Sequence, residues 1–326
     1  MDYCYDYFFY CKPFVIPLQT SHGLWSERRG IIIQLRDQQG NIGKGEIAPL
    51  SWFGSETIEQ ATQFCSQLDT KFNPQIIDQI PNNLPCCQFA FESALVNLEK
   101  VANNSPITNL DYNLSSNYQI YLVNHPWNYS YLLPTGLAAL QSIQTKVAQQ
   151  HNTFKQKIGV QSFEQERSLI KELMSYLPTQ GKLRLDANGG LNLETTKRWL
   201  EFAELENELE HKIELIEQPL PPEDFSTLLA LSQQFKTAIA LDESVSSLTQ
   251  LQNCYEQGWR GVYVLKAAIM GSPSRLAKGL QTHPIDVLFS SVFETAIGRQ
   301  NVLELAVKRG NPNRALGFGV NHWFQE

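Results

Sequence analysis

Short apolar runs typical of strands alternate with amphipathic segments typical of helices from about Tyr118 to the C-terminus. This alternation constrains the fold more than any other feature, because strands separated by helices predict a parallel sheet with helical crossovers. Seven runs are strand candidates: residues 120–123, 153–158, 183–187, 213–216, 238–241, 262–265 and 287–289. Seven or eight such units in roughly 200 residues fit a closed (β/α) barrel better than a doubly wound sheet, which would have fewer units.

Two of the segments between these strands also have the end signals of helices. Ser162 and Gln165 have the spacing of a capping box, and apolar residues at helical spacing follow them. Residues 296–309 end with two basic residues just before Gly310, which is typical of a helix C-terminus. We therefore expect a helix after each of the strands that precede these segments.

The N-terminal third of the chain has a different pattern, in which strand-like and helix-like runs are mixed. Residues 30–35 are predicted to form a strand and residues 36–40 a turn. Residues 56–68 and 87–101 are predicted to form helices. The N-terminal part is therefore expected to be an α+β unit that precedes the barrel.

Charge and cysteine usage exclude several classes of function. The formal net charge of −7 and the lack of a basic run argue against nucleic acid and anionic membranes as partners. The N-terminus contains Asp2 and Asp6 and has no basic region, so no signal peptide is expected, and no run of about 18 apolar residues could span a bilayer. None of the six cysteines has CxxC spacing, so we expect reduced thiols, with Cys86 and Cys87 in the core of a cytoplasmic protein.

Function in a (β/α) barrel is expected at the C-terminal ends of the strands, which surround one mouth. The candidate strands end in, or are followed by, polar or charged residues: Lys157, Asp186, Glu217, Asp242, Lys266 and the pair Ser290 and Ser291. Successive positions, taken to Ser291, are 29, 31, 25, 24 and 25 residues apart, about one strand, one helix and two loops. A polar residue is therefore predicted at the same height on successive strands.

Taken singly, these residues have ordinary explanations. An aspartate at a strand end often caps the next helix, Lys266 could extend to solvent, and Lys155 and Lys157, on one face of their strand, could be solvated. Those explanations do not account for the coincidence across five consecutive units. Three converging carboxylates repel one another unless a cation lies between them. Carboxylates without histidine or cysteine suit magnesium or manganese rather than zinc, and Lys157 and Lys266 would flank this metal from opposite sides.

This arrangement resembles that of a known family. Two lysines in a KxK strand, then aspartate, glutamate and aspartate on the next three strands, then lysine, are similar to the muconate-lactonizing subgroup of the enolase superfamily. The segments LRLDANGG, LIEQPL and ALDES resemble barrel segments of that family, and residues 43–61 resemble its N-terminal capping domain. The similarity extends over the whole chain.

The resemblance implies a role for each strand-end residue. The implied metal ligands are Asp186, Glu217 and Asp242. The implied acid/base pair is Lys157 and Lys266, and Lys155 would be an electrostatic partner of the substrate carboxylate. The implied cofactor is magnesium, with manganese possible, and the implied partner is a small-molecule carboxylate substrate.

The resemblance also implies an α/β fold, a modified (β/α)7β TIM-like barrel with an N-terminal α+β capping domain. We expect the capping domain at residues 1–112, the barrel with its metal site at residues 113–312, and a segment at residues 313–326 that closes the barrel and returns toward the cap. Residues 51–56, SWFGSE, differ from the Pro-Gly-Phe-Ser form typical of the family's cap loop.

The chemistry that the family implies is removal of a proton next to a carboxylate. Such a proton is very weakly acidic, because its removal produces an enediolate with two negative charges. Enolase-superfamily sites lower this barrier with a lysine or histidine base and magnesium. Like charges at Lys155 and Lys157 disfavour double protonation, so one amine is expected to be neutral enough to act as a base.

Residues 290–298, SSVFETAIG, are similar to the o-succinylbenzoate synthases of this subgroup. That resemblance implies dehydration of 2-succinyl-6-hydroxy-2,4-cyclohexadiene-1-carboxylate to o-succinylbenzoate, a step of menaquinone or phylloquinone synthesis, with Ser290 and Ser291 at the substrate. Dipeptide epimerases carry an Asp-x-Asp motif near the last strand, but residues 314–325 contain no acidic residue. Mandelate-racemase-like members use a histidine at a late strand end, and none is found there.

Two other functions stay open at this point. An N-succinylamino acid racemase or a muconate cycloisomerase would keep the same lysines and carboxylates. A non-catalytic metal-binding scaffold would keep the carboxylates, but it would not need the lysines. The oligomeric state, monomer or homo-oligomer, is left open.

Two smaller features also leave alternatives. Gly317 and Gly319 could let the last strand approach substrate, or they could mark a turn or close packing. Asn188, two residues after Asp186, could contact the water shell of the metal.

Overall fold

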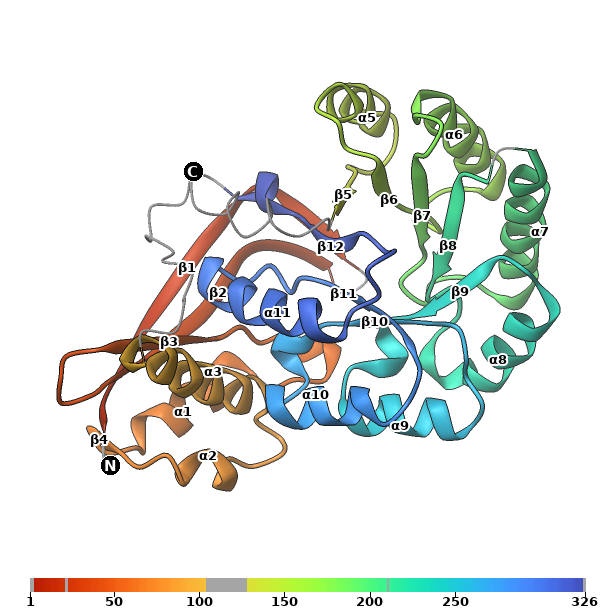
Figure 1. The fold of residues 1–326 in the computed structure, drawn as a ribbon. Coiled ribbons are helices and arrows are strands. Elements are labelled where there is room, and N and C mark those ends of the chain that lie inside the picture. Colours follow the sequence, from red (N-terminus) through yellow and green to blue (C-terminus); the bar gives the residue numbers. More distant parts are fainter. Residues whose placement is uncertain (1–2, 21–22, 104–127, 210, 325–326) are drawn as a thin grey trace.

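The computed structural model describes residues 3–20, 23–103, 128–209 and 211–324, and these form two sheets (Figure 1). The first sheet is antiparallel, with strand order β3-β2-β1-β4. The second is parallel, with order β11-β10-β9-β8-β7-β6-β5-β12. The antiparallel sheet of the cap corresponds to the mixed pattern of the N-terminal third. The parallel sheet of the barrel corresponds to the alternation of strands and helices after it.

In the described residues of the cap, the antiparallel sheet is combined with three helices. Its elements are β1 (Tyr3–Thr20), β2 (Gly23–Arg36), β3 (Ile42–Ile47), α1 (Ile58–Ser66), β4 (Lys71–Phe72), α2 (Ile76–Gln79) and α3 (Pro85–Ala102). Strand β2 alternates in burial, with Ile31, Ile33 and Leu35 fully buried and the residues between them half-buried. The buried face of the sheet packs against α3, as the period of two predicts.

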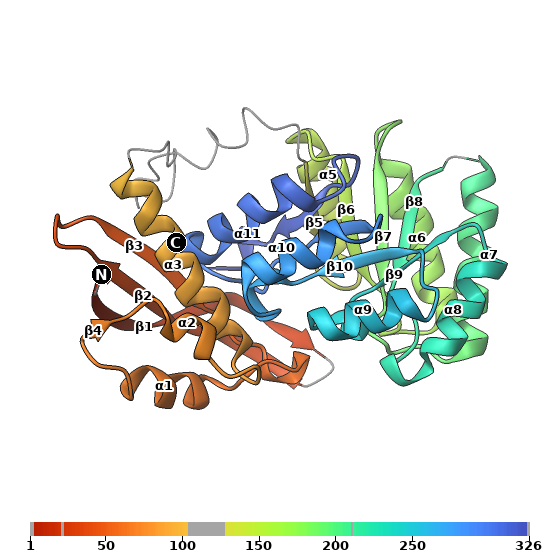
Figure 2. The same cartoon turned by 60° about the horizontal axis from the view of Figure 1, so that its bottom comes forward.

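The glycines of the GKGE segment permit this packing. A Cβ atom at Gly45 would overlap the carbonyl oxygen of Ala90, and one at Gly43 would overlap that of Ala94. Strand β3 therefore approaches α3 at backbone distance. On its other side α3 lies against α10 and α11 of the barrel (Figures 1 and 2), where Asn97 donates to Asn301 at 2.9 Å.

The described barrel residues contain eight strands with seven helices between them. The elements are β5 (Tyr129–Leu132), α5 (Ala138–Ala148), β6 (Thr153–Lys157), α6 (Phe163–Tyr176), β7 (Lys182–Asp186), α7 (Leu193–Leu209), β8 (Ile213–Glu217), α8 (Phe225–Gln234), β9 (Ala238–Leu241), α9 (Leu248–Glu256), β10 (Val262–Leu265), α10 (Pro273–Gln281), β11 (Asp286–Phe289), α11 (Ala296–Arg309) and β12 (Leu316–Gly319). The expected (β/α)7β barrel with its α+β cap is confirmed.

The barrel is nearly closed by its last strand. Strand β12 pairs in parallel with β5, and a single bridge between Ser290 and Gly317 joins it to the end of β11. A Cβ atom at Gly319 would overlap the Ser130 carbonyl oxygen, and one at Gly317 would contact the Ser290 side chain. Of the alternatives left open by the sequence, close packing therefore explains both glycines.

Most predicted elements are confirmed to within a few residues. The helix at residues 296–309 has both predicted ends, and the capping box of Ser162 and Gln165 begins α6. All six thiols are free, and Cys86 and Cys87 are fully buried. None of the helices among the described residues has both the length and the apolar composition needed to cross a membrane.

Some predicted features lie outside the described residues, and two strands of the structure were not predicted. The strand expected at residues 120–123, and the domain boundary between residues 112 and 113, lie outside the described residues. Strand β5 was not among the candidates, because its sequence YSYL is short and half polar. The 18-residue strand β1 was also missed, since its apolar residues are interrupted by Asp6, Lys12 and Pro13.

Candidate active site

The barrel interior contains a small apolar cluster of its own. This cluster shows which side chains of each strand point to the interior. The cluster consists of Leu215, Ala240, Val262, Val264 and Leu288. Side chains alternate along a strand, so the residue two positions further on points to the same interior. Those residues are Glu217 after Leu215, Asp242 after Ala240, Lys266 after Val264 and Ser290 after Leu288. The carboxyl and amine groups therefore lie above the apolar layer, at the barrel mouth.

Three of the predicted residues are direct lateral neighbours. Lys157 is paired in register with Asp186 on β7, and Asp186 is paired with Glu217 on β8. Asp186, Glu217 and Asp242 are 6%, 1% and 2% exposed, so three carboxyl groups are buried close together. The pairing of the strands places Lys157, Asp186 and Glu217 in one register, whereas Asp242 lies two residues beyond Ala240, the partner of Glu217.

Two lysines neutralise these carboxylates. The Lys155 ammonium lies between two of them, 2.6 Å from Asp186 Oδ2 and 2.8 Å from Glu217 Oε1. The Lys266 ammonium pairs with both oxygens of Asp242. Lys155 therefore contacts the carboxylates themselves in this structure.

Burial changes the proton affinities of this cluster. Burial raises the pKa of Glu217 to about 8 and that of Asp242 to about 6, and neighbouring carboxylates add to both shifts. Burial also acts on Asp186, but the Lys155 charge outweighs it and lowers the pKa of Asp186. Burial opposes the charge of Lys155, yet the attraction of Asp186 and Glu217 raises the Lys155 pKa. Lys155 therefore stays a cation, and Glu217 keeps its proton until the pH rises to about 8.

The donor set fits a hard cation. Among the described residues no three carboxylate, imidazole or thiol side chains are arranged ready to hold a metal ion: the Lys155 ammonium lies between Asp186 and Glu217, and the Lys266 ammonium pairs with Asp242. The nearby oxygen donors, however, are those that magnesium prefers. The raised pKa values of Glu217 and Asp242 indicate that additional positive charge would be stabilised there.

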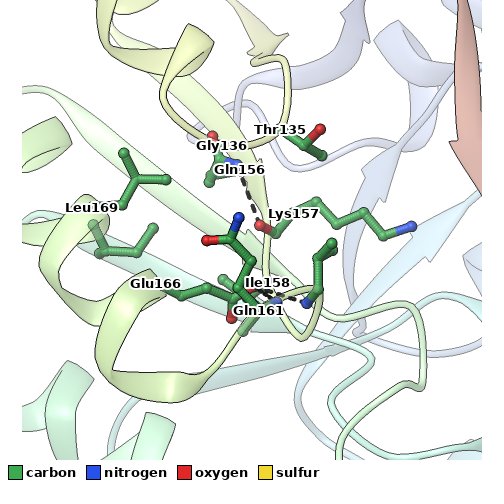
Figure 3. Close-up of a pocket in the computed structure, with 10 residues that line it drawn as sticks. Thr135, Gly136, Gln156, Lys157, Ile158, Gln161, Glu166 and Leu169 are labelled. Carbon is green, nitrogen blue, oxygen red and sulfur yellow. Dashed lines mark hydrogen bonds between the residues drawn. The ribbon is translucent and has the colours of Figure 1, made fainter.

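Lys157 differs from the other two lysines. Among the described residues no carboxylate pairs with its ammonium group. Figure 3 shows its side chain extending away from the pocket that Gln156 and Glu166 line. By strand alternation it points to the same interior as Lys155. Lys157 therefore has a side chain at the barrel mouth that no carboxylate of the described residues holds.

The two serines have different surroundings. Ser290 is half-buried on the interior side, with its backbone N–H donating to Leu265 O at 2.9 Å. The Ser291 hydroxyl is buried and turned toward the following loop, where it donates to Glu294 Oε2 at 2.8 Å and accepts from Phe293 N at 2.9 Å. Ser290 thus lies at the mouth, whereas Ser291 fixes the loop after β11.

Phe53 is a site residue that sequence analysis missed. It belongs to the cap loop SWFGSE, and the Lys266 ammonium lies 3.9 Å from the centre of its ring. A cation over an aromatic face is attracted by the ring quadrupole. The unusual form of this loop was the only available signal. The cap therefore contributes directly to the surroundings of Lys266.

Gln218 and Glu243 were also missed. The fully buried Gln218 side chain accepts from Asp242 N at 2.9 Å and so connects the ends of β8 and β9. Glu243 is a fourth carboxylate beside the cluster, and it accepts from Asn188 Nδ2 at 3.2 Å. Asn188 also donates its backbone N–H to Asp186 Oδ1 at 3.0 Å. Of these groups Asn188 contacts a carboxylate of the cluster directly, whereas Gln218 holds the backbone of Asp242.

Comparison with protein families matches both parts of the chain. Residues 138–314 match the family described as enolase C-terminal domain-like. Residues 5–98 match the family described as MenC, N-terminal domain. The two matches follow the division between the barrel and the antiparallel sheet.

Individual relatives agree with these matches. The chain is 40% identical to the o-succinylbenzoate synthase of Thermosynechococcus vestitus over 318 residues, 96% of this chain and 91% of that protein. It is 30% identical to a chloromuconate cycloisomerase of Cupriavidus necator, but over only 43% of this chain and 36% of that protein. The first similarity therefore extends over nearly the whole chain, and the second over less than half.

Among solved structures, too, an o-succinylbenzoate synthase is more similar to the chain than an enzyme of another activity. An o-succinylbenzoate synthase from Thermosynechococcus elongatus, complexed with magnesium in its active site, has a TM-score of 0.84 and 38% identity over 99% of this chain and 94% of that chain. A dipeptide epimerase from Enterococcus faecalis, complexed with magnesium and a dipeptide, has a TM-score of 0.75 and 19% identity over 97% and 90% of the two chains. The second likeness is one of fold alone.

Proposed function

The chain belongs to the o-succinylbenzoate synthase family of the enolase superfamily and is a lyase, and from this premise we propose the reaction and the residues that perform it. The proposed reaction is the magnesium-dependent dehydration of 2-succinyl-6-hydroxy-2,4-cyclohexadiene-1-carboxylate to o-succinylbenzoate. The observation that supports it most is the gathering of three buried carboxylates and three lysines at one mouth of the barrel. The product would enter menaquinone or phylloquinone synthesis, in a cytoplasmic enzyme.

We propose Asp186, Glu217 and Asp242 as the metal ligands. A divalent cation there, magnesium or alternatively manganese, would stabilise the negative charge that develops on the substrate carboxylate when the α-proton leaves. Binding of such a cation requires the Lys155 and Lys266 ammonium groups to move off the carboxylate oxygens that they contact. Both side chains are long and have rotatable stems, so this rearrangement needs no movement of the strands.

We propose Lys157 as the base. Its neutral amine would accept the α-proton, and the proton it gains would then assist departure of the hydroxide on the same face. Lys266 would stabilise the developing enediolate by its charge from the other side of the barrel. Lys155 would remain a cation, since its pKa is raised by Asp186 and Glu217, and would contribute charge toward the substrate carboxylate.

We propose smaller roles for the surrounding groups. Ser290 would contact the substrate at the mouth, whereas Ser291 would act mainly by holding its loop against Glu294. The division of the chain into a cap at residues 1–112, a barrel at residues 113–312 and a closing segment at residues 313–326 is likewise a proposal. Oligomeric state has no bearing on these roles, because all proposed site residues come from one chain.

A second candidate is racemization of an N-succinylamino acid, and a specific feature favours considering it. A racemase must move protons on both faces of the substrate, and Lys157 and Lys266 end strands that lie apart in the sheet, β6 and β10. However, Lys266 is held by Asp242 and lies on the Phe53 ring, which suits a fixed charge. Dehydration needs only one lysine as base, so it remains the preferred function.

The two reactions can be compared directly with the purified protein and magnesium. We expect conversion of the cyclohexadiene substrate to o-succinylbenzoate, followed by the absorbance of the aromatic product. In parallel, an N-succinylamino acid is incubated in deuterated water, and α-deuterium and chirality are measured. Fast racemization with negligible dehydration would assign the racemase instead. Inactivity in both assays with magnesium bound would indicate a non-catalytic scaffold.

A further inference from the structure

The backbone that leaves the Lys157 strand is held by one buried carboxylate. Strand β6 ends at Lys157, and Ile158 N still donates to Asp186 O at 2.8 Å. The next three backbone N–H groups leave the sheet and converge on Glu166, which is 5% exposed. They are Gly159 N at 2.8 Å from Oε2, Val160 N at 2.8 Å from Oε1 and Gln161 N at 2.9 Å from Oε1.

The Glu166 carboxylate and the three N–H groups it accepts from form a clamp. This clamp lies on the side of β6 away from the Lys157 amine. Figure 3 shows Gln156 and Glu166 at a small pocket that Lys157 also lines, with the Lys157 side chain extending away from both of them. The pocket is about 150 Å³. The Gln156 side chain also donates to the Lys157 carbonyl oxygen at 3.2 Å. The main chain of Lys157 is therefore fixed on the face opposite to the one on which its amine works.

Glu166 is not needed to begin the helix it belongs to. Ser162 and Gln165 already form a capping box, in which Ser162 Oγ accepts from Gln165 N and Gln165 Oε1 accepts from Ser162 N. Glu166 therefore has its carboxylate available for the loop. Hydrogen bonds to an ionised carboxylate are stronger than those between neutral groups, and three of them determine a loop conformation.

We infer that Glu166 is a positioning residue for Lys157: its carboxylate fixes residues 159–161 so that the amine stays at the α-proton. The inference rests on the proposed role of Lys157 as base. Glu166 does not contact the reacting atoms. A displacement of about 1 Å at a reacting group can cost on the order of a hundredfold in rate, so the clamp has a catalytic consequence.

The test is Glu166→Gln, with Gln165→Ala as the matched control. The amide keeps the size of the carboxylate but has one accepting oxygen and no charge, so it cannot hold three N–H groups. We expect kcat to fall about tenfold or more, with KM and magnesium affinity unchanged. Gln165→Ala breaks the neighbouring capping box and should lower Tm about as much as Glu166→Gln does. Unlike Glu166→Gln, it should leave kcat unchanged. Glu166→Asp keeps the charge and is expected to recover part of kcat.

Amide hydrogen exchange measures the clamp without turnover. Amide exchange at residues 159–161 should be faster in Glu166→Gln than in wild type, but unchanged in Gln165→Ala.

Wild-type kcat in Glu166→Gln, or an equal loss of kcat in Gln165→Ala, would overturn the positioning role. If wild type catalyses α-proton exchange in deuterated water but no dehydration, the proposed reaction fails, and the effect of Glu166→Gln is then measured on that exchange. Should Glu166→Gln not fold, kcat and amide hydrogen exchange are compared in the same way for Glu166→Asp. Unchanged kcat and unchanged amide exchange in Glu166→Asp would overturn the positioning role.

Discussion

Lys157→Arg is expected to be folded and to bind magnesium, yet to lose at least about a hundredfold in turnover. Arginine keeps the positive charge but cannot give up its proton in a protein. The substitution therefore keeps a cationic group at this position and removes the neutral amine that would act as the base. General-base removal typically costs about 10²–10⁴-fold, and a larger loss is expected where the uncatalysed proton abstraction is slow. Turnover, circular dichroism and magnesium affinity are measured on the same preparation.

Lys155→Arg is the matched control on the same face of β6. Lys155 contacts Asp186 and Glu217, and its proposed role needs charge rather than a removable proton. Arginine provides that charge and can pair with both carboxylates, so Lys155→Arg should keep more activity than Lys157→Arg. Near wild-type turnover in Lys157→Arg, together with an inactive Lys155→Arg, would mean that the two roles are reversed.

Removal of divalent metal is expected to abolish turnover reversibly. Asp186, Glu217 and Asp242 are buried together, and without a divalent cation there the negative charge that develops on the substrate carboxylate would not be stabilised. Treatment with EDTA followed by added magnesium should remove and restore activity. Full activity in EDTA would contradict the metal assignment.

Magnesium affinity should also depend on pH and on Asp242. The pKa is raised to about 8 at Glu217 and to about 6 at Asp242, so both carboxyls gain protons as pH falls through these values. Protons then compete with the cation, and affinity measured by calorimetry should decrease from pH 8 to pH 6. Asp242→Asn preserves shape, removes one charge and should weaken magnesium binding without unfolding the barrel. Unchanged affinity in this variant would exclude Asp242 as a ligand.

The barrel and the height of its polar residues could be predicted because both depend on short-range periodicity. Alternation along a strand places Asp242 two residues above the interior residue Ala240, and regular unit lengths repeat that arrangement on neighbouring strands. The same local rule predicted that Lys155 and Lys157 share one face. Local signals at a helix start identified the capping box at Ser162.

Contacts between distant segments could not be predicted in this way. Phe53 reaches Lys266 from the cap, more than 200 residues earlier in the chain, and neither sequence segment specifies the other. Glu46 provides a second example, since this buried cap residue accepts from Thr295 N at 2.9 Å and Gly298 N at 2.8 Å at the start of α11. Such contacts depend on how the cap packs on the barrel, which hydrophobic periodicity does not determine.

The position of the Lys155 amine was beyond sequence reasoning for a different reason. Its face was predicted correctly, but a lysine stem has several rotatable bonds, and its direction depends on the nearest unpaired charge. In this structure those charges are Asp186 and Glu217, at 2.6 and 2.8 Å. The expected partnership with a substrate carboxylate therefore stays a prediction about the complex with substrate.

The central claim is that Lys157 removes the proton next to the substrate carboxylate, and isotopic substitution at that carbon tests it most directly. Single-turnover formation of o-succinylbenzoate is measured with magnesium and with the cyclohexadiene substrate carrying hydrogen or deuterium at the carbon that bears the carboxylate. We predict slower product formation from the deuterated substrate in wild type, and at least about a hundredfold slower formation in Lys157→Arg. Absence of o-succinylbenzoate with wild type, or equal rates for both isotopes in wild type with an unimpaired Lys157→Arg, would contradict the claim.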